Sequence, residues 1–290
     1  GTVKLLLWGA FAVVLAAYLP TILSFFRVWG GHTYSHGYII APLVVWLTWR
    51  RRERLFASAE GTPWAYLLLI AMSVVWLLAM VMELQVIHQG LLPLVLVGWA
   101  VAVFGPRAAR TLLPVVATFL LAVPFWEILV PLLQTLTTAV SGSVVQLAGI
   151  EAEILGYQIV LPSGVIEVAT SCSGLGYFLV GLVLGVIFAH LFLEDWRSRL
   201  AILGLAAVFA MVANWIRVGS LTFIGHFSQM EAGLLKEHGT YGWVVFTLSL
   251  IPLGFLAHRM EAWDRSLVAR KKTEEETRGE EPEEKLALGK

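Results

Sequence analysis

The chain has one cysteine, and two cationic residues that could act with it stand far along the sequence. Cys172 is followed by Ser173 and Gly174, whose small side chains leave a sulfur atom accessible and let a substrate backbone approach. The thiolate is the nucleophilic form of cysteine, and a helix N-terminus or a nearby cation stabilises it. Arg217 and His238 are the candidate partners. Together these residue types suit attack on a peptide carbonyl.

Arg217 stands near the end of an otherwise uncharged apolar run. Placing a guanidinium there costs about 3 kcal/mol on insertion scales, so a functional role is the first hypothesis. Its planar fork of donors suits a developing oxyanion or a substrate carboxylate. Asn214 precedes it by three residues and shares its helical face, where the amide could orient the guanidinium or bind substrate. The alternative is that Arg217 extends to lipid headgroups.

His238 opens a loop that runs into an apolar segment. An imidazole moves protons near neutral pH, so His238 is the candidate to take the proton of Cys172 and return it to a leaving amine. The alternatives are an exposed loop histidine at 238, a role for the nearby His226, and a buried apolar role for Cys172.

A second group of polar residues precedes these candidates in the sequence. His32 and His36 are four residues apart, a spacing that can bind metal on a helix. Glycines flank them and the glutamate of a metalloprotease helix is missing, so we expect no metal and no cofactor. His36 and Glu167 are instead expected to position substrate, and Glu127 can reach the same side.

The composition places the chain among membrane proteins. It is 58% hydrophobic and 14% charged, whereas a soluble domain carries about 25% charged residues. The net charge is zero, so no nucleic-acid partner is expected. The single cysteine excludes an intramolecular disulfide. The sequence predicts an all-α polytopic fold with about eight transmembrane helices. They are expected near Val3–Phe26, Gly37–Trp49, Trp64–Met82, Ile87–Phe104, Thr111–Val130, Ser173–Leu193, Leu200–Phe223 and Tyr241–Ala257.

The basic residues predict the orientation, because lysine and arginine favour cytoplasmic loops. With both termini in the cytoplasm, only Arg27, Arg217 and Lys236 of the 20 basic residues fall on the outer side. The same arrangement puts Cys172 and His238 on that side. The sequence therefore predicts an inner-membrane protein whose three reactive residues share the outer face.

Two segments depart from the apolar pattern. Between Pro131 and Thr170, the stretch Gln134–Leu147 suits a partly buried or interfacial helix, and Glu151–Ala169 suits a hairpin around a Pro-Ser-Gly turn. The second segment, residues 261–290, is highly charged, and we expect a disordered cytoplasmic tail after a transmembrane domain that spans residues 1–260.

From about Arg27 to Met260 the sequence resembles the exosortase and archaeosortase family. The resemblance is carried by "YSHGYIIAPLVVWLTWRRRERL", "LLAVPFWEILVPLLQTLTTAVSGSVVQLAGI", "GYQIVLPSGVIEVATSCSGLGYFLVGLVLG", "ANWIRV" and "HGTYGWVVF". It implies that Cys172, Arg217 and His238 are catalytic. It further implies a cysteine peptidase and transpeptidase that acts through a thioester.

The resemblance also implies the partners. Such enzymes process exported proteins with a C-terminal sorting signal, which is a Pro-Glu-Pro motif (PEP-CTERM), a transmembrane helix and a basic end. They accompany exopolysaccharide and biofilm systems. Membrane lipid surrounds the substrate helix, and the acceptor of the transfer is unknown. Transfer and simple hydrolysis both stay open.

Two other functions stay open. A non-catalytic membrane subunit or transporter for polysaccharide assembly would use the outer polar residues as a binding path. A metal-dependent intramembrane protease would use His32, His36 and a glutamate. Neither explains why Cys172, Arg217 and His238 fall on one predicted side of the membrane.

Overall fold

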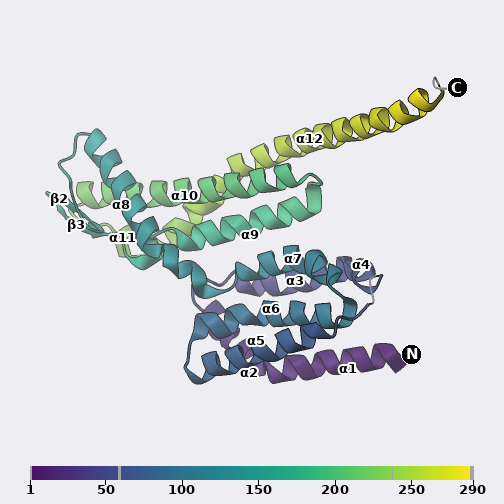
Figure 1. The fold of residues 1–290 in the computed structure, drawn as a ribbon. Coiled ribbons are helices and arrows are strands. Elements are labelled where there is room, and N and C mark those ends of the chain that lie inside the picture. The colour runs from purple at the N-terminus through teal and green to yellow at the C-terminus, as the bar shows by residue number, and fades with distance from the viewer. Residues whose placement is uncertain (1, 58–59, 237, 288–290) are drawn as a thin grey trace. The chain divides into compact units, whose positions relative to one another are not determined.

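The chain forms two compact units, Gly1–Leu129 and Val130–Lys290. The computed structural model describes residues 2–57, 60–236 and 238–287 (Figure 1). Most described residues are helical, and the fold is that of a multi-pass membrane protein with one small sheet. The expected all-α membrane fold with a short hairpin is thus confirmed.

The first unit is a bundle of apolar helices. Their bounds are α1 (Thr2–Ala17), α2 (Leu19–Trp29), α3 (Gly37–Arg50), α4 (Arg52–Phe56), α5 (Trp64–Val81), α6 (Gln85–Phe104), α7 (Arg107–Leu120) and the 3-10 helix η1 (Pro124–Leu129). A cluster of buried side chains in this unit joins α3, α5, α6 and α7 through Leu47, Ala65, Ala100 and Ala108. Small side chains at such contacts let apolar helices approach closely in a membrane, where dispersion packing holds them together.

Polar side chains add a second set of links to the first unit. The Thr21 hydroxyl of α2 accepts a bond from Trp76 Nε1 of α5 at 2.7 Å and lies 3.1 Å from His88 Nδ1 of α6. Gln89 Nε2 donates to Ser24 Oγ at 2.8 Å. These buried bonds connect α2 with both neighbours, where hydrocarbon would offer the same groups no partner.

The second unit carries the sheet and the long helices. Its elements are α8 (Val130–Leu147), β1 (Glu153–Leu155), β2 (Gln158–Leu161), β3 (Gly164–Glu167), the 3-10 helix η2 (Thr170–Cys172), α9 (Leu175–Phe192), α10 (Trp196–Phe227), α11 (Gly233–Lys236) and α12 (His238–Ala287). Helices α9 and α10 pack closely because Gly181 faces Ala206 and Ala210. A Cβ atom on this glycine would lie 3.0 Å from the Ala206 carbonyl oxygen.

The sheet is antiparallel, with the strand order β1-β2-β3. Ile159 of β2 pairs with Ile166 of β3 and is fully buried. This inner face of the sheet packs on Val145 of α8 and Phe223 of α10, and Figure 1 shows β2 and β3 beside those two helices. The turn at Pro162 and Ser163 joins β2 to β3, as the Pro-Ser-Gly sequence predicted.

Six helices are long and apolar enough to cross a membrane, or seven if the bent pair α1 and α2 forms one span. These numbers cover the described residues and rest on length and composition. The sequence analysis expected about eight spans. Helix α7 has 14 residues and ends earlier than the expected span Thr111–Val130. Helix α3, also 14 residues, agrees with the short expected span Gly37–Trp49 but is not among the candidate spans. Conversely, Gln134–Leu147, expected to be partly buried or interfacial, belongs to a 24-residue candidate span, Pro124–Leu147.

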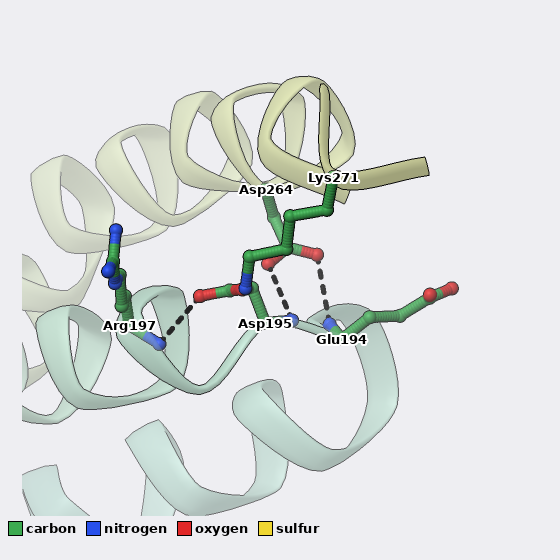
Figure 2. Close-up of polar contacts among 5 residues, drawn as sticks. All are labelled: Glu194, Asp195, Arg197, Asp264 and Lys271. Atoms are coloured by element: carbon green, nitrogen blue, oxygen red, sulfur yellow. Dashed lines mark hydrogen bonds and ion pairs between the residues drawn. The ribbon is translucent and has the colours of Figure 1, made fainter. Parts of the chain in front are cut away.

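The middle of α12 is bound to the turn between α9 and α10 (Figure 2). The Asp264 carboxylate accepts the backbone N–H groups of Glu194 and Asp195 at 2.9 and 3.0 Å. Asp195 in turn accepts the Arg197 N–H at 2.8 Å and pairs with Lys271. The Lys271 ammonium and this N–H hold the pKa of Asp195 below its usual range. These contacts fall within residues 261–290, where we expected disorder, and α12 is helical to Ala287.

Candidate active site

Cys172 ends the short helix η2, immediately before α9, and is half-buried with a free thiol. Its backbone N–H donates to the Ala169 carbonyl at 2.8 Å. Gly174 then takes a left-handed conformation, with φ of +99°, which turns the chain into α9. The fully buried Ser173 accepts the Leu175 N–H on its hydroxyl at 3.3 Å. Cys172 therefore lies next to the N-terminus of a helix, as the sequence predicted.

Asn214 of α10 binds the main chain at Cys172. Its Nδ2 atom donates to the Cys172 carbonyl oxygen at 2.9 Å and lies 3.3 Å from the Thr137 hydroxyl of α8. Thr137 donates to the Ser173 carbonyl at 3.1 Å, and Gln134 donates to the Val168 carbonyl at 2.8 Å. These buried side chains satisfy irregular backbone that would otherwise lack partners in an apolar region.

The same amide explains why residue 174 is a glycine. A Cβ atom at Gly174 would lie 2.8 Å from Asn214 Nδ2 and 3.0 Å from its Cγ. Any side chain there would push Asn214 away from the Cys172 carbonyl. The structure shows Asn214 holding the segment around Cys172, and its expected role in orienting Arg217 or binding substrate stays a prediction. Its Oδ1 atom is buried and has no hydrogen-bond partner among the described residues.

Arg217 is buried within the second unit, with 6% of its surface exposed. It lies on α10 three residues after Asn214, and its guanidinium stands over the ring of Tyr177 with Cζ 5.7 Å from the ring centroid. A guanidinium over an aromatic face is a favourable cation–π arrangement. This burial argues against the alternative in which the side chain extends to lipid headgroups.

The first turns of α12 lie against the same arginine. A Cβ atom at Gly242 would be 2.7 Å from Arg217 Nε and 2.5 Å from the Tyr177 hydroxyl oxygen. His238 begins α12 one turn before Gly242; its side chain lies outside the part of the chain that the structure describes. His226, the competing histidine, lies 3.2 Å from the Ser163 hydroxyl through Nδ1.

A family model described as transmembrane exosortase (Exosortase_EpsH) matches residues 28–255. The chain belongs to the transmembrane exosortase family. No curated protein and no solved structure matches it. Membership implies a membrane protein that processes sorting signals and suggests a peptidase-type enzyme. The matched range contains all three candidate catalytic residues of this exosortase.

Sequence reasoning missed several residues around the cysteine of this exosortase. Thr137 and Gln134 stand in a Thr- and Gln-rich segment whose polarity was noticed but whose partners lie about 35 residues away. Tyr177 interacts electrostatically with Cys172 and Arg217. Its hydroxyl is buried without a hydrogen-bond partner among the described residues. The available signal in the sequence was that Tyr177 stands in the first turn of the apolar helix that follows Cys172.

For Glu167 and His36, the role of positioning substrate stays a prediction. Glu167 is exposed on β3 and has no hydrogen bond or ion pair to the residues described around Cys172. His36 belongs to the first unit, where its buried Nε2 atom donates to the Leu121 carbonyl at 2.9 Å. Burial lowers the pKa of His36, while the carbonyl groups of Leu121 and Thr33 oppose that shift.

The first unit also contains a polar pocket of about 310 Å3. His32, Tyr34, Gln85 and Glu127 line it. Burial and the Glu127 carboxylate raise the pKa of Tyr34. Among the described residues, no three His, Cys, Asp or Glu side chains form a group that could hold a metal ion. The metal-dependent alternative therefore has no ligand set in the described part of the exosortase.

Proposed function

We propose that this exosortase is a cysteine peptidase in which Cys172 attacks the peptide bond of a protein sorting signal. One observation carries the proposal: Asn214 and Arg217, one turn apart on α10, contact the Cys172 backbone and the first turns of α12 respectively. This arrangement gathers the elements that carry the thiol, the guanidinium and His238.

In the proposed reaction, Cys172 Sγ bonds to the scissile carbonyl carbon while His238 takes the thiol proton. The tetrahedral intermediate collapses, the C–N bond breaks, and His238 returns the proton to the leaving amine. The product is a thioester on Cys172. An acceptor nucleophile or water then attacks that thioester and releases the thiol.

Arg217 stabilises the negative oxygen of the tetrahedral intermediate in this scheme. Its guanidinium is pre-positioned by the Tyr177 ring and by Gly242, so no reorganisation is needed when the charge develops. Binding of an acidic substrate residue is the second role compatible with a buried planar cation. Its apolar surroundings strengthen either interaction compared with water.

We further propose that the substrates are exported proteins with a C-terminal PEP-CTERM signal, as the family resemblance implies. Both termini of the exosortase lie in the cytoplasm, and the active site faces the outer side of the inner membrane. This orientation follows from the distribution of basic residues. The transmembrane helix of the substrate lies in lipid. The cleaved protein is passed from Cys172 to an acceptor, and the system serves exopolysaccharide export.

Co-expression with a tagged protein that carries a Pro-Glu-Pro sorting tail tests the proposal. Wild type is compared with Cys172→Ala, and mass spectrometry identifies the new carboxyl end. Cleavage is expected in wild type and lost in Cys172→Ala. An added mass on the new end establishes transfer, whereas a free carboxylate establishes hydrolysis.

Other outcomes point to the alternatives. Equal cleavage by wild type and Cys172→Ala excludes this cysteine as the nucleophile, and chelator sensitivity then tests the metal-dependent protease. If no cleavage occurs while export of polysaccharide persists in Cys172→Ala, the non-catalytic subunit is favoured. Thiol alkylation of wild type provides a chemical control, because it should abolish cleavage as completely as the substitution.

A further inference from the structure

The strand β3 has one edge that no other described strand covers. In the order β1-β2-β3, β3 pairs only with β2. Hydrogen-bonded and non-bonded residue pairs alternate in an antiparallel ladder. The Val168 N–H donates to the Tyr157 carbonyl at 2.8 Å, so the pairs Ile159 with Ile166 and Leu161 with Gly164 are the bonded ones. The backbone groups of the alternate β3 residues therefore point away from β2.

Those alternate residues are Val165 and Glu167. Their backbone N–H and C=O groups form no hydrogen bond elsewhere in the described chain. Both residues are exposed, Val165 by 52%. The inner face of the sheet is meanwhile anchored by Ile166, which contacts the end of α10 near Gly225. The open edge is thus rigidly held yet accessible.

The open edge leads directly to the candidate nucleophile. Only four residues separate Glu167 from Cys172, and three of them, Ala169, Thr170 and Ser171, are exposed. Gln134 fixes the carbonyl of Val168, the residue that follows the end of β3. A chain that ran along the edge would therefore be guided toward the sulfur atom by backbone already in place.

We propose that the extended segment of the substrate binds to the open edge of β3 as a fourth strand, which presents its scissile bond to Cys172. The inference rests on the proposed function, since the partner is the polypeptide that carries the sorting signal. The occupant is a polypeptide because the edge offers alternating donors and acceptors that another backbone matches residue by residue.

Strand addition suits a peptide that must be read close to a membrane. Unpaired backbone groups of an extended peptide are costly outside water, and pairing with β3 satisfies half of them. Side chains on alternate positions of the peptide then lie over the outer face, beside Val165 and Glu167. A proline in the substrate is tolerated where its nitrogen points away from β3.

Disulfide trapping tests the arrangement without requiring catalysis. Val165→Cys is introduced into the Cys172→Ala background, and single cysteines are scanned through the tagged substrate ahead of its transmembrane helix. The proposal expects cross-links at every second substrate position, because side chains alternate across a strand. The matched control is Leu155→Cys, which is equally exposed at 51% on the opposite edge strand and should cross-link at least about 5-fold less.

The periodicity decides between occupants. Cross-links with a spacing of three or four residues would indicate a bound helix and overturn the proposal. A complete lack of substrate cross-links would also overturn it, provided that a maleimide reagent labels Val165→Cys freely. Exosortase dimers cross-linked through Val165→Cys in place of substrate would show that a second copy covers the edge. Periodic cross-links without wild-type cleavage would retain this inference and reject the proposed peptidase function.

A backbone substitution provides the kinetic test. Glu167→Pro removes an N–H of the open edge and leaves the bonds to β2 intact, and the extended Ile166 before it tolerates a following proline. KM should rise about 5- to 10-fold with kcat within about 2-fold. Glu167→Ala keeps the N–H and should raise KM less than half as much. Equal KM values for the two variants, at equal thermal stability, would contradict strand addition.

Discussion

The two units bury polar side chains for different purposes. In the first unit several of them bond to one another between helices, as Thr21 does with Trp76 and His88. Others, such as His36, bond main-chain carbonyls there. In the second unit they bond to main-chain carbonyls, as Asn214 does with Cys172 and Thr137 with Ser173. The first pattern joins regular helices, whereas the second supports a stretch of backbone that is not helical.

This difference indicates where chemistry is possible. Side chain pairs between helices consume their own donors and acceptors, so they stabilise the unit and offer little to a substrate. Irregular backbone at membrane depth requires supporting groups, and it exposes a residue such as Cys172 at a helix start. We therefore expect polar substitutions to reduce activity in the second unit and stability in the first.

The largest effect is expected from Arg217→Lys. A lysine keeps the charge but lacks the planar fork, so kcat/KM for the sorting substrate should fall by at least about 100-fold. The control is Arg197→Lys, the same change at an exposed position of the same helix, α10. It should stay within about 2-fold of wild type. If Arg217→Lys retained a third or more of the wild-type kcat/KM, the planar guanidinium would not be required for the mechanism.

A smaller effect is expected where α12 approaches Arg217. Gly242→Ala places a methyl group against Arg217 and the Tyr177 hydroxyl, so kcat should fall about 10-fold as the guanidinium shifts. Gly239→Ala, three residues earlier in open space, is the matched control and should change kcat less than 2-fold. Similar kcat values for the two variants would mean that this contact does not position the arginine.

In the first unit, Thr21→Val should change stability without changing kcat. The substitution preserves shape but leaves Trp76 Nε1 and His88 Nδ1 without their shared partner, at a cost of about 1 to 2 kcal/mol in the free energy of unfolding. Thr222→Val in the second unit is the control, because among the described residues its hydroxyl bonds the Val218 carbonyl of its own helix and no other group. If fully folded Thr21→Val protein had a lower kcat than wild type, the polar side chains of the first unit would not serve stability alone.

The smallest effect is the pH dependence that His36 gives the first unit. Because burial lowers the pKa of His36, the unfolded chain binds its proton near pH 6.5 and the folded chain only at lower pH. Its stabilising contribution is complete above pH 6.5 and decreases as the pH falls toward the folded pKa. Thermal unfolding at several pH values measures this, and His36→Gln should flatten the profile. An unchanged profile would assign the pH dependence to other groups.

Much of the fold was predictable because it depends on local properties of the chain. The runs that became α5, α6, α9 and α10 were recognised from hydropathy, and the hairpin from its Pro-Ser-Gly turn. The number of spans was less predictable, because α7 ends at Leu120, before the end of its apolar run, and a polar segment joined η1 to form a longer candidate span. Helicity beyond residue 260 was also unexpected. It accompanies the contacts of Asp264 with the α9–α10 turn, and these join residues far apart in the sequence.

The candidate site likewise has residues that the sequence singled out and contacts that it did not reveal. Residue type and a helix start singled out Cys172, and charge in an apolar run singled out Arg217. The partners of Asn214 could not be inferred, because Cys172 and Thr137 lie 42 and 77 residues from it along the chain. The role of Gly242 was equally hidden, since a glycine signals a close approach only when the neighbouring helix is known.

By itself, the sequence determined the membrane class, the helical fold, the hairpin and the reactive residue types, since each follows from composition or from neighbours within a few residues. Only the tertiary structure decided that Asn214 supports the Cys172 backbone, that Gly242 admits Arg217, and that β3 keeps an open edge beside the cysteine. Those features depend on distances between segments far apart in the chain, and these distances are set by how the helices pack.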